Sequence, residues 1–572
     1  MAPKLPLPKR ETVRIERSEG YSKIQDIYIQ MRDSAELCAD IFLPRDCAEN
    51  IAVPCLLSMG PYGKDVHALE WGLPRTDIYS KMNAKIKPLG PDACMEHVDP
   101  LVWTREFGYA LARVDVRGIG GSPGIFDPCG LARSQEIDAD AEGNDLYDVI
   151  EWISKQPWCN GRVGMTGISY LGMVGWTAAQ QKPPSLKAVI PWEAANDFYS
   201  QRIRPGGIAN TRFHTHWWNN AVLPYQHGRR EGVPEEILKT QRVDYLKLIT
   251  EAEYRGDGPW VYFDRHRSAA KIEVPFYSAG NWMDTELHCP GNILGYMRAS
   301  SEFKFLEMHI GTHIDAYYCR DLIEKQRRFL DYFLFDKHDN GLTEAPRVDL
   351  VIRKGREQFR RAEEDFPPPD TEYTEYVLTP EGGLTNKGSN PAWDENQLVC
   401  EYPGLTGKAH FQTEPLNREV ELLGFPYLVL EVSTNAKDLD LFITITNIGP
   451  DGEALQFVGN HDETTDAVTR GYFRLSHREL DPKYSTAHLP FLSQKRPAVV
   501  ESGRRYTTKV PVRPSSMIFE RGHRIRIELS AKDSDSLMPI MQHEGGERDE
   551  TRFGGYNRFF VGSRLVLPCV TR

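Results

Sequence analysis

The sequence predicts a doubly wound α/β domain that carries a helical insertion and is followed by an all-β jelly-roll domain. Two observations predict the α/β part: apolar, strand-like runs alternate with helix-like segments up to about residue 195, and the alternation returns after about residue 270. A third predicts the jelly roll, because short alternating segments with turn signals between them fill the chain from about residue 345. A chain of 572 residues is also too long for one compact core.

The first part of the α/β domain, residues 1–195, opens with an expected hairpin. The stretch "IQDIYIQMRDSAELCADIFLP" alternates apolar and polar residues on both sides of a turn at Asp33–Ser34. Strands are then expected in "NIAVPCLLSMG", "YALARVDV", "GRVGMTGIS" and "LKAVIPWEAA", and helices in "NDLYDVIEWISKQ" and "YLGMVGWTAAQQ". Strands that alternate with helices pair in parallel, so this part predicts a doubly wound sheet.

The remaining chain divides into three expected parts. Residues 196–270 contain helix-like segments and loops with many aromatic and charged residues, which indicates a helical cap inserted into the α/β domain. Residues 271–344 return to the α/β pattern with two strand-then-loop units and a helix that we expect to end near Gly341. Residues 345–572, with segments such as "PYLVLEVSTN" and "HRIRIELSA", form the expected jelly-roll β-sandwich.

Composition narrows the class of protein. The formal net charge of −12 argues against nucleic acid as a partner, since binding a polyanion needs a basic surface. No stretch approaches the roughly 18 apolar residues of a membrane span, and no apolar segment follows the basic N-terminus as in a secretory signal. The ten cysteines form no C-x-x-C pair or metal-like cluster. We therefore expect a cytoplasmic protein without a metal or cofactor.

A glycine-flanked serine is the strongest candidate for chemistry. The segment "GISYLG" (residues 167–172) fits G-x-S-x-x-G and lies between an expected strand and an expected helix, the context that a nucleophile elbow requires. Small neighbours let strand and helix approach closely, and the helix N-terminus directs its N–H groups toward a developing oxyanion. The alternative is a serine that only caps the helix, which is common. Ser169 is the predicted nucleophile.

An acid and a base follow Ser169 in the order Ser–acid–His that such folds use. Asp284 in "GNWMD" and His313 in "IGTH" each come just past an expected strand, so both should lie at the edge of the sheet where ligands bind. A histidine with a pKa near ~6.5 suits the task of taking the serine proton. Other candidates are weaker: His309 lies inside a strand, and His288 follows Asp284 too closely to occupy a separate loop. Asp197, Asp315 and Glu286 are also nearby in sequence.

The oxyanion hole needs two donors. One is expected from the backbone N–H of Tyr170, the residue after the nucleophile. The other is expected from the loop "MGPYGKD" after an early strand, in which the phenol of Tyr62 can donate. The alternative for Tyr62 is a packed ring in a Pro-Tyr-Gly turn.

These motifs together resemble the CocE/NonD (cocaine-esterase-like) serine hydrolases, which are relatives of the X-Pro dipeptidyl-peptidases. The similarity extends over nearly the whole chain, through "MRDSAELCADIFLP", "GPYGKD", "DVRGIGGSPGIFD", "GISYLG", "GNWMD", "YFLFDKHDNG", "GYFRLSHRELDP" and "FERGHRIRIELSA". It implies an α/β-hydrolase domain, a cap and a jelly roll with the active site where they meet. It also implies Ser169, Asp284 and His313 as the triad, and Tyr62 with the Tyr170 N–H as the oxyanion hole.

Three departures from the family pattern concern the site. The histidine motif is usually Gly-Pro-Trp-x-His, whereas this chain has Gly311-Thr312-His313, and Asn281 stands where glycine usually precedes the tryptophan. In the amino-ester hydrolase subgroup an acidic cluster holds the substrate's ammonium group; Glu286 matches one member, but Leu287 follows it. The expected pocket residues are Glu286 and three cap aromatics, which could equally be cap core: Phe213, Trp217 and Trp218.

The expected function is hydrolysis of an ester or amide of a small-molecule acyl substrate through an acyl-enzyme. Three alternative functions remain open. The acyl-enzyme could pass to an alcohol or amine, as in an acyltransferase or a cyclising biosynthetic enzyme. The protein could be an X-Pro dipeptidyl-peptidase-like peptidase. It could also be a binding module with a decayed hydrolase. The oligomeric state is open as well, and the cap or jelly roll could form a homodimer.

Overall fold

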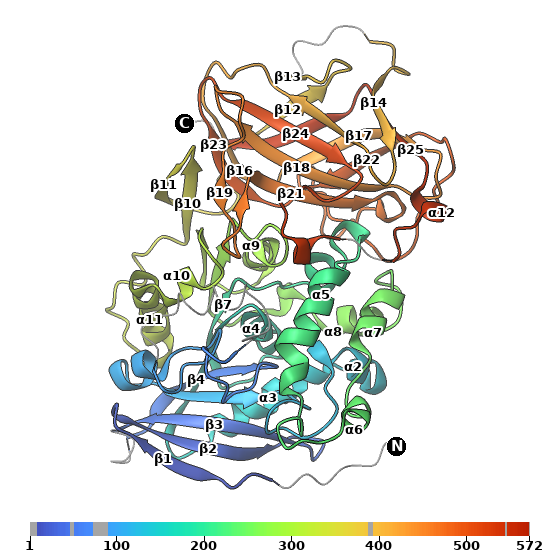
Figure 1. Ribbon diagram of the computed structural model, residues 1–572. Coiled ribbons are helices and arrows are strands. Elements are labelled where there is room, and N and C mark those ends of the chain that lie inside the picture. Colours follow the sequence, from blue (N-terminus) through green and yellow to red (C-terminus); the bar gives the residue numbers. More distant parts are fainter. Residues whose placement is uncertain (1–8, 46–50, 72–89, 387–392, 544–545, 571–572) are drawn as a thin grey trace.

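The computed structural model of the chain describes residues 9–45, 51–71, 90–386, 393–543 and 546–570. Figure 1 shows a strand-rich C-terminal part stacked on the α/β part, with green helices of the middle of the chain along one side. This arrangement confirms the predicted fold class of an α/β-hydrolase domain with a helical cap and an all-β C-terminal domain.

The α/β part is built on a mixed sheet with a parallel centre. Its pairings run in the order β1-β2-β3-β5-β4-β6-β7-β8-β9, antiparallel up to β5 and parallel from there on. The predicted hairpin is β2 and β3, closed by a hydrogen bond from the Ser34 N–H to the Met31 carbonyl. The strands are β1 (Val13–Arg17), β2 (Tyr21–Gln30), β3 (Glu36–Pro44), β4 (Val53–Gly60), β5 (Ala110–Asp115), β6 (Cys159–Ile168), β7 (Leu186–Trp192), β8 (Phe276–Asn281) and β9 (Lys304–His309).

Helices pack against this sheet through apolar stripes. Helix α3 buries Leu146, Val149, Ile150 and Ile153 at helical spacing, and Asp140 caps its N-terminus by accepting a hydrogen bond from the Gly143 N–H. The helices are α2 (Leu131–Ile137), α3 (Ala141–Ser154), α4 (Tyr170–Gln181), α9 (Cys289–Arg298), α10 (Asp315–Tyr318) and α11 (Arg320–Leu334).

Helix α11 ends earlier than the sequence suggested. We expected an end near Gly341, but the last helical residue is Leu334. Asp336 takes a left-handed backbone conformation with φ of 56°, and the Lys337 N–H bonds back to the Asp331 carbonyl, which closes the helix.

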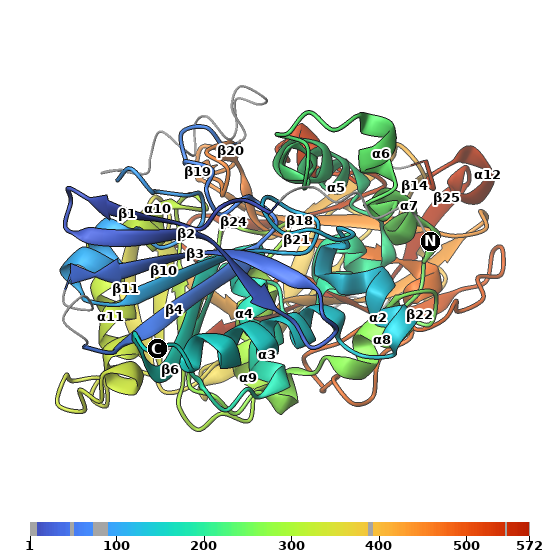
Figure 2. The same ribbon diagram turned by 90° about the horizontal axis from the view of Figure 1, so that it is seen from below.

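The segment between β7 and β8 is helices and loops. It contains α5 (Thr211–Trp217), α6 (Glu235–Lys239), α7 (Tyr245–Glu251), α8 (Trp260–His266) and several short turns, among them η4 (Tyr199–Ile203). Figure 2 shows α5, α6 and α7 grouped beside the α/β part. This cap also reaches the C-terminal domain, where buried Arg204 pairs with Glu547 at 2.8 Å.

The C-terminal domain is a β-sandwich, joined to the α/β part by the strands that follow α11. Strand β10 (Val348–Lys354) links the two parts, because it pairs in parallel both with β9 and with β23 (Ser515–Phe519) of the sandwich; β11 (Glu357–Glu363) pairs with β10. The sandwich strands are β12 (Thr371–Leu378), β13 (Leu384–Asn386), β14 (Leu398–Pro403), β15 (Lys408–Gln412), β16 (Val420–Gly424), β17 (Tyr427–Thr434), β18 (Asp440–Ile448), β21 (Ala467–Arg474), β22 (Tyr506–Pro511), β23 (Ser515–Phe519), β24 (Arg524–Ser530), β25 (Tyr556–Phe560) and β26 (Arg564–Val570), with a small ribbon of β19 (Phe457–Val458) and β20 (Thr464–Thr465).

A membrane span needs a long helix of strongly apolar residues, and the helices of the described segments are short or carry charged residues. None combines the necessary length with the necessary apolar character.

Candidate active site

Ser169 occupies a strained turn between β6 and α4. Its backbone has φ of 55° and ψ of −117°, a conformation that L-residues rarely adopt. Two glycines allow the turn: a Cβ on Gly167 would lie 2.4 Å from Cβ of Leu171, and a Cβ on Gly172 would lie 2.8 Å from the Gly167 and Trp192 carbonyl oxygens. The turn has the geometry of the predicted nucleophile elbow.

A histidine and an aspartate continue from Ser169 in a hydrogen-bonded line. Oγ of Ser169 lies 3.0 Å from Nε2 of His288, and Nδ1 of His288 lies 2.5 Å from Oδ2 of Asp284. Asp284 also accepts hydrogen bonds from the backbone N–H groups of Leu287 and His288, both at 3.0 Å. A carboxylate on Nδ1 favours the tautomer whose Nε2 carries a lone pair. The line therefore has the order nucleophile, base and orienting acid.

Electrostatics give these two side chains different charges at neutral pH. Burial lowers the pKa of His288 to about 4, against the opposing effect of Asp284. Burial alone would raise the pKa of Asp284, but the neighbouring His288 and His313 hold it well below its usual range. His288 is thus a neutral base and Asp284 an anion.

The structure does not bring His313 to Ser169. His313 follows β9 as predicted, but its Nδ1 lies 2.7 Å from Oε2 of Glu193 and its Nε2 lies 3.5 Å from Oε1 of Glu96. Its ring stacks on that of His288, with ring centroids 5.4 Å apart. Burial would lower the pKa of His313, but the two glutamates raise it to about 10, so the ring is charged at neutral pH. The imidazole of His313, which the sequence predicted to contact Ser169, is therefore bound to Glu193, the residue just after β7.

The expected oxyanion donors are Tyr170, which follows the nucleophile, and Tyr62, whose ring contacts Tyr170. Tyr170 is the first residue of α4, so its N–H belongs to the helix N-terminus. The Tyr62 ring is buried and meets the Tyr170 ring at a centroid distance of 6.4 Å, while Trp217 donates a hydrogen bond to the Tyr62 oxygen at 3.2 Å. The loop that carries Tyr62 is anchored by Lys64, whose ammonium group pairs with Asp40 at 2.6 Å.

The predicted pocket residues take separate positions. Phe213 lies under the guanidinium of Arg202, and Trp217 stacks on Tyr170 with ring centroids 6.1 Å apart. Trp218 instead stacks on Phe126 at 5.3 Å, which joins the cap to the α/β domain.

The fourth predicted pocket residue, Glu286, is buried and paired with Arg470 of the jelly roll at 3.0 Å. Burial raises the pKa of Glu286 to about 7, although Arg470 opposes this shift. Its carboxyl group is therefore already engaged by the C-terminal domain.

Two residues that contact the site histidines were not predicted from the sequence. Glu193 ends the segment "LKAVIPWE", and Arg202 lies in η4 of the cap with Nη1 3.1 Å from Nε2 of His288. The spacing Asp284-x-x-x-His288 was a usable signal, since residues four apart meet on one face of a helical turn. Nothing in the sequence around Arg202 distinguishes it from the other cap arginines.

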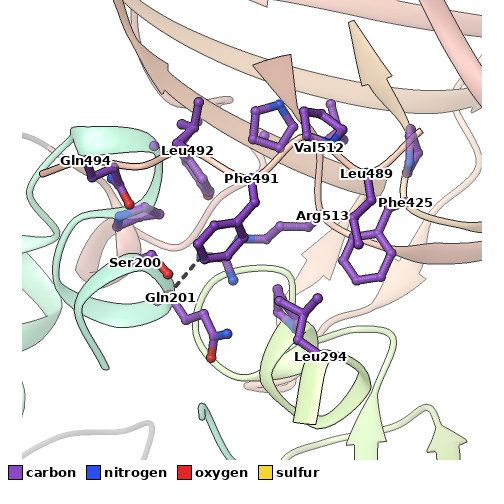
Figure 3. A pocket seen from close by; sticks show the side chains of 18 residues that line it. Ser200, Gln201, Leu294, Phe425, Leu489, Phe491, Leu492, Gln494, Val512 and Arg513 are labelled. Carbon is purple, nitrogen blue, oxygen red and sulfur yellow. Dashed lines mark hydrogen bonds between the residues drawn. The ribbon is translucent and has the colours of Figure 1, made fainter. Parts of the chain in front are cut away.

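A separate pocket of about 110 Å³ lies where the cap, α9 and the jelly roll meet. Figure 3 shows Gln201 of the cap, Leu294 of α9 and Phe491 of the C-terminal domain around it. Its lining includes Gln201 and Pro290, close in sequence to Arg202 and His288, but not the Ser169 side chain. Among the residues that the structure describes, no group of three or more His, Cys, Asp or Glu side chains is arranged to hold a metal ion.

The fold and the site define a serine hydrolase of the α/β-hydrolase class. A family model described as X-Pro dipeptidyl-peptidase (S15 family) matches residues 33–315, and one for the X-Pro dipeptidyl-peptidase C-terminal non-catalytic domain matches residues 340–563. The chain is 24% identical to a cocaine esterase of Rhodococcus, over 97% of this chain and 99% of that protein. It is 23% identical to a putative serine esterase of Mycobacterium bovis, over 89% and 90% of the two chains.

Solved structures agree on the fold. A CocE/NonD family hydrolase from Staphylococcus aureus superposes with a TM-score of 0.80 at 24% identity, covering 96% of this chain and 94% of that one. An α-amino acid ester hydrolase gives a TM-score of 0.69 at 17% identity, covering 98% of both chains. The chain belongs to the CocE/NonD family of serine hydrolases, relatives of the X-Pro dipeptidyl-peptidases.

Proposed function

We propose that this serine hydrolase cleaves a carboxylic ester of a small molecule, with Ser169 as nucleophile, His288 as base and Asp284 as the acid that orients it. The observation that carries the proposal is the single line from Oγ of Ser169 through the His288 ring to Asp284, at 3.0 and 2.5 Å. In this assignment His288 takes the role that sequence reasoning gave to His313.

The reaction then proceeds in two steps. Ser169 attacks the carbonyl carbon while Nε2 of His288 takes the hydroxyl proton, and the Tyr62 O–H and the Tyr170 N–H donate to the oxyanion. The imidazolium returns the proton to the leaving alcohol, which leaves an acyl-serine. Water attacks the acyl-serine with the same base and donors, which releases the acid and restores the serine.

The charges at the site argue against an ester substrate that carries a free amino group. An ammonium group needs an uncompensated carboxylate nearby, but Glu286 is paired with Arg470, and Glu193 and Glu96 both contact the charged His313. The charged group closest to the His288 ring nitrogen that faces Ser169 is the Arg202 guanidinium, which would repel an ammonium. The names of the relatives also include esterases.

Labelling with a fluorophosphonate tests the proposal. We expect one covalent adduct on the wild-type protein, measured by intact-mass spectrometry, and hydrolysis of members of an ester panel. Both should be lost in Ser169→Ala and retained in Ser154→Ala, a control serine at the end of α3. An adduct that persists in folded Ser169→Ala would exclude Ser169 as the nucleophile.

Tyr62→Phe is expected to lower kcat by about 10²-fold or more, the scale of one oxyanion-hole donor. The variant loses the hydrogen bond from Trp217 but keeps the ring and its contacts with Tyr170 and Trp71, so the fold should be retained. Tyr332→Phe, on α11, is the control. Unchanged kcat in Tyr62→Phe with an intact circular dichroism spectrum would remove the phenol from the mechanism.

The compartment is a further part of the proposal. We infer a reducing cytoplasmic setting, which is supported by free thiols at all nine described cysteines, most of them buried.

A further inference from the structure

Arg202 is a buried cation that forms no ion pair in the described part of the chain, although its charge acts at longer range on the buried Glu96 carboxyl. The residue is 1% exposed, and none of the ion pairs between described residues includes it. Other buried arginines find strong acceptors: Arg474 lies 2.8 Å from Asp440, and Arg353 donates to backbone carbonyls and to the Ser515 hydroxyl. Because a guanidinium stays charged at all accessible pH values, burying one without a counter-ion is costly unless something else compensates it.

The hydrogen-bond contacts of Arg202 are unusually weak for such a group. Nη1 contacts Sδ of Met173 at 3.2 Å and Nε2 of His288 at 3.1 Å, and Phe198 and Phe213 face the guanidinium plane. Nε has no hydrogen-bond partner, and no hydrogen bond between described residues uses Nη2. Nε–H and Nη2–H form the parallel edge that binds a carboxylate with two hydrogen bonds.

The position of the guanidinium relates it to the reaction. Oγ of Ser169 and Nη1 of Arg202 both approach Nε2 of His288, at 3.0 and 3.1 Å. A substrate carbonyl at Ser169 therefore lies within a few ångströms of the guanidinium. A neutral imidazole has one lone pair on this nitrogen, so the Arg202 N–H and the Ser169 O–H compete for it.

We propose that Arg202 recognises a carboxylate on the substrate, and that pairing with this carboxylate draws the guanidinium away from His288 and leaves the lone pair to Ser169. This inference rests on the proposed function, and it adds that the substrate is an acidic ester. The low pKa of His288, caused mainly by burial and partly by Arg202, agrees with a guanidinium beside the ring in the free enzyme.

Matched ester pairs test the inference. One pair places the charge on the acyl side: the 4-nitrophenyl half-ester of succinic acid against 4-nitrophenyl pentanoate. The other places it on the leaving group: the butyrate ester of 4-hydroxybenzoate against that of 4-cresol. In at least one pair we expect wild-type kcat/KM to favour the anionic ester by about 10-fold or more, the scale of a charge-assisted hydrogen bond.

Variants then attribute this preference to the guanidinium. Arg202→Met should remove the preference, Arg202→Lys should keep part of it, and Arg212→Met, an exposed arginine of the same cap, should keep all of it. Succinate should change the rate of fluorophosphonate labelling of the wild type but not of Arg202→Met, a readout that needs no turnover. If Arg202→Met does not fold, Arg202→Lys and the succinate experiment on the wild type decide.

Two outcomes would overturn the inference. One is a wild type that favours the neutral ester in both pairs and whose labelling rate succinate does not change. The other is a preference that survives unchanged in a folded, labelled Arg202→Met. In both cases the labelled Ser169 would still support the proposed hydrolase, whereas a wild type that takes no label at all would instead contradict the proposed function.

Discussion

His288→Ala is expected to lower kcat by about 10⁶-fold, the scale on which loss of a triad histidine acts. Without the imidazole, no base lies within hydrogen-bonding distance of Oγ of Ser169 among the described residues. Fluorophosphonate labelling should be lost as well, because the reagent needs the same activated serine. The cavity left by the ring lies beside the stacked His313, so folding is checked by circular dichroism and the melting temperature.

His313→Gln is the matched comparison. Its side chain keeps an amide donor toward Glu193 but has no basic ring, and we expect labelling to continue. The melting temperature should fall, since removing one partner of a buried charge pair is destabilising by about 3–5 kcal/mol. A folded His313→Gln that takes no label, together with a labelled His288→Ala, would assign the base to His313 and contradict our proposal.

The nucleophile could be predicted because its signal is local. Gly167, Ser169 and Gly172 specify the turn through steric contacts within one strand and one helix, so the motif and its context suffice. The fold class could be predicted for a similar reason, since the alternation of strands and helices before residue 195 dictates parallel pairing. The junction of the two parts could not, because the alternating pattern of β10 does not reveal that this strand pairs both with β9 and with the jelly-roll strand β23.

The base could not be predicted because it depends on which carboxylate each histidine meets. The order rule selected His313 after β9, and the closeness of His288 to Asp284 counted against His288. The structure shows the opposite arrangement. The turn before α9 brings His288 into hydrogen-bonding contact with Asp284, whereas His313 is hydrogen-bonded to Glu193. The partners come from segments far apart in sequence, which local patterns do not encode.

Asp284→Asn is expected to lower kcat by about 10⁴-fold, as when the acid of such a triad is made neutral. The carboxylate now accepts the Nδ1–H of His288 and so keeps the lone pair on Nε2. An amide N–H donor at this place would favour the other tautomer, in which Nε2 is protonated and cannot accept from Ser169. Asp315→Asn, a carboxyl that was an alternative acid in the sequence, should keep kcat within a few-fold. Equal losses in the two variants would contradict the role of Asp284.

The pH dependence of labelling distinguishes the two histidines without any substitution. The base must be neutral, so the labelling rate falls as the pH drops through the pKa of the base. With His288 as base, whose pKa burial lowers to about 4, the wild type should keep its rate from neutral pH down to about pH 5. Since Asp284 raises the pKa of His288, any residual labelling of Asp284→Asn should persist to still lower pH. With His313 as base, whose pKa the glutamates raise to about 10, the rate should already be falling at pH 9. A labelling rate that already falls while the pH is lowered toward pH 8 would therefore identify His313 as the base. A rate that falls only when the pH is lowered into the acid range identifies His288.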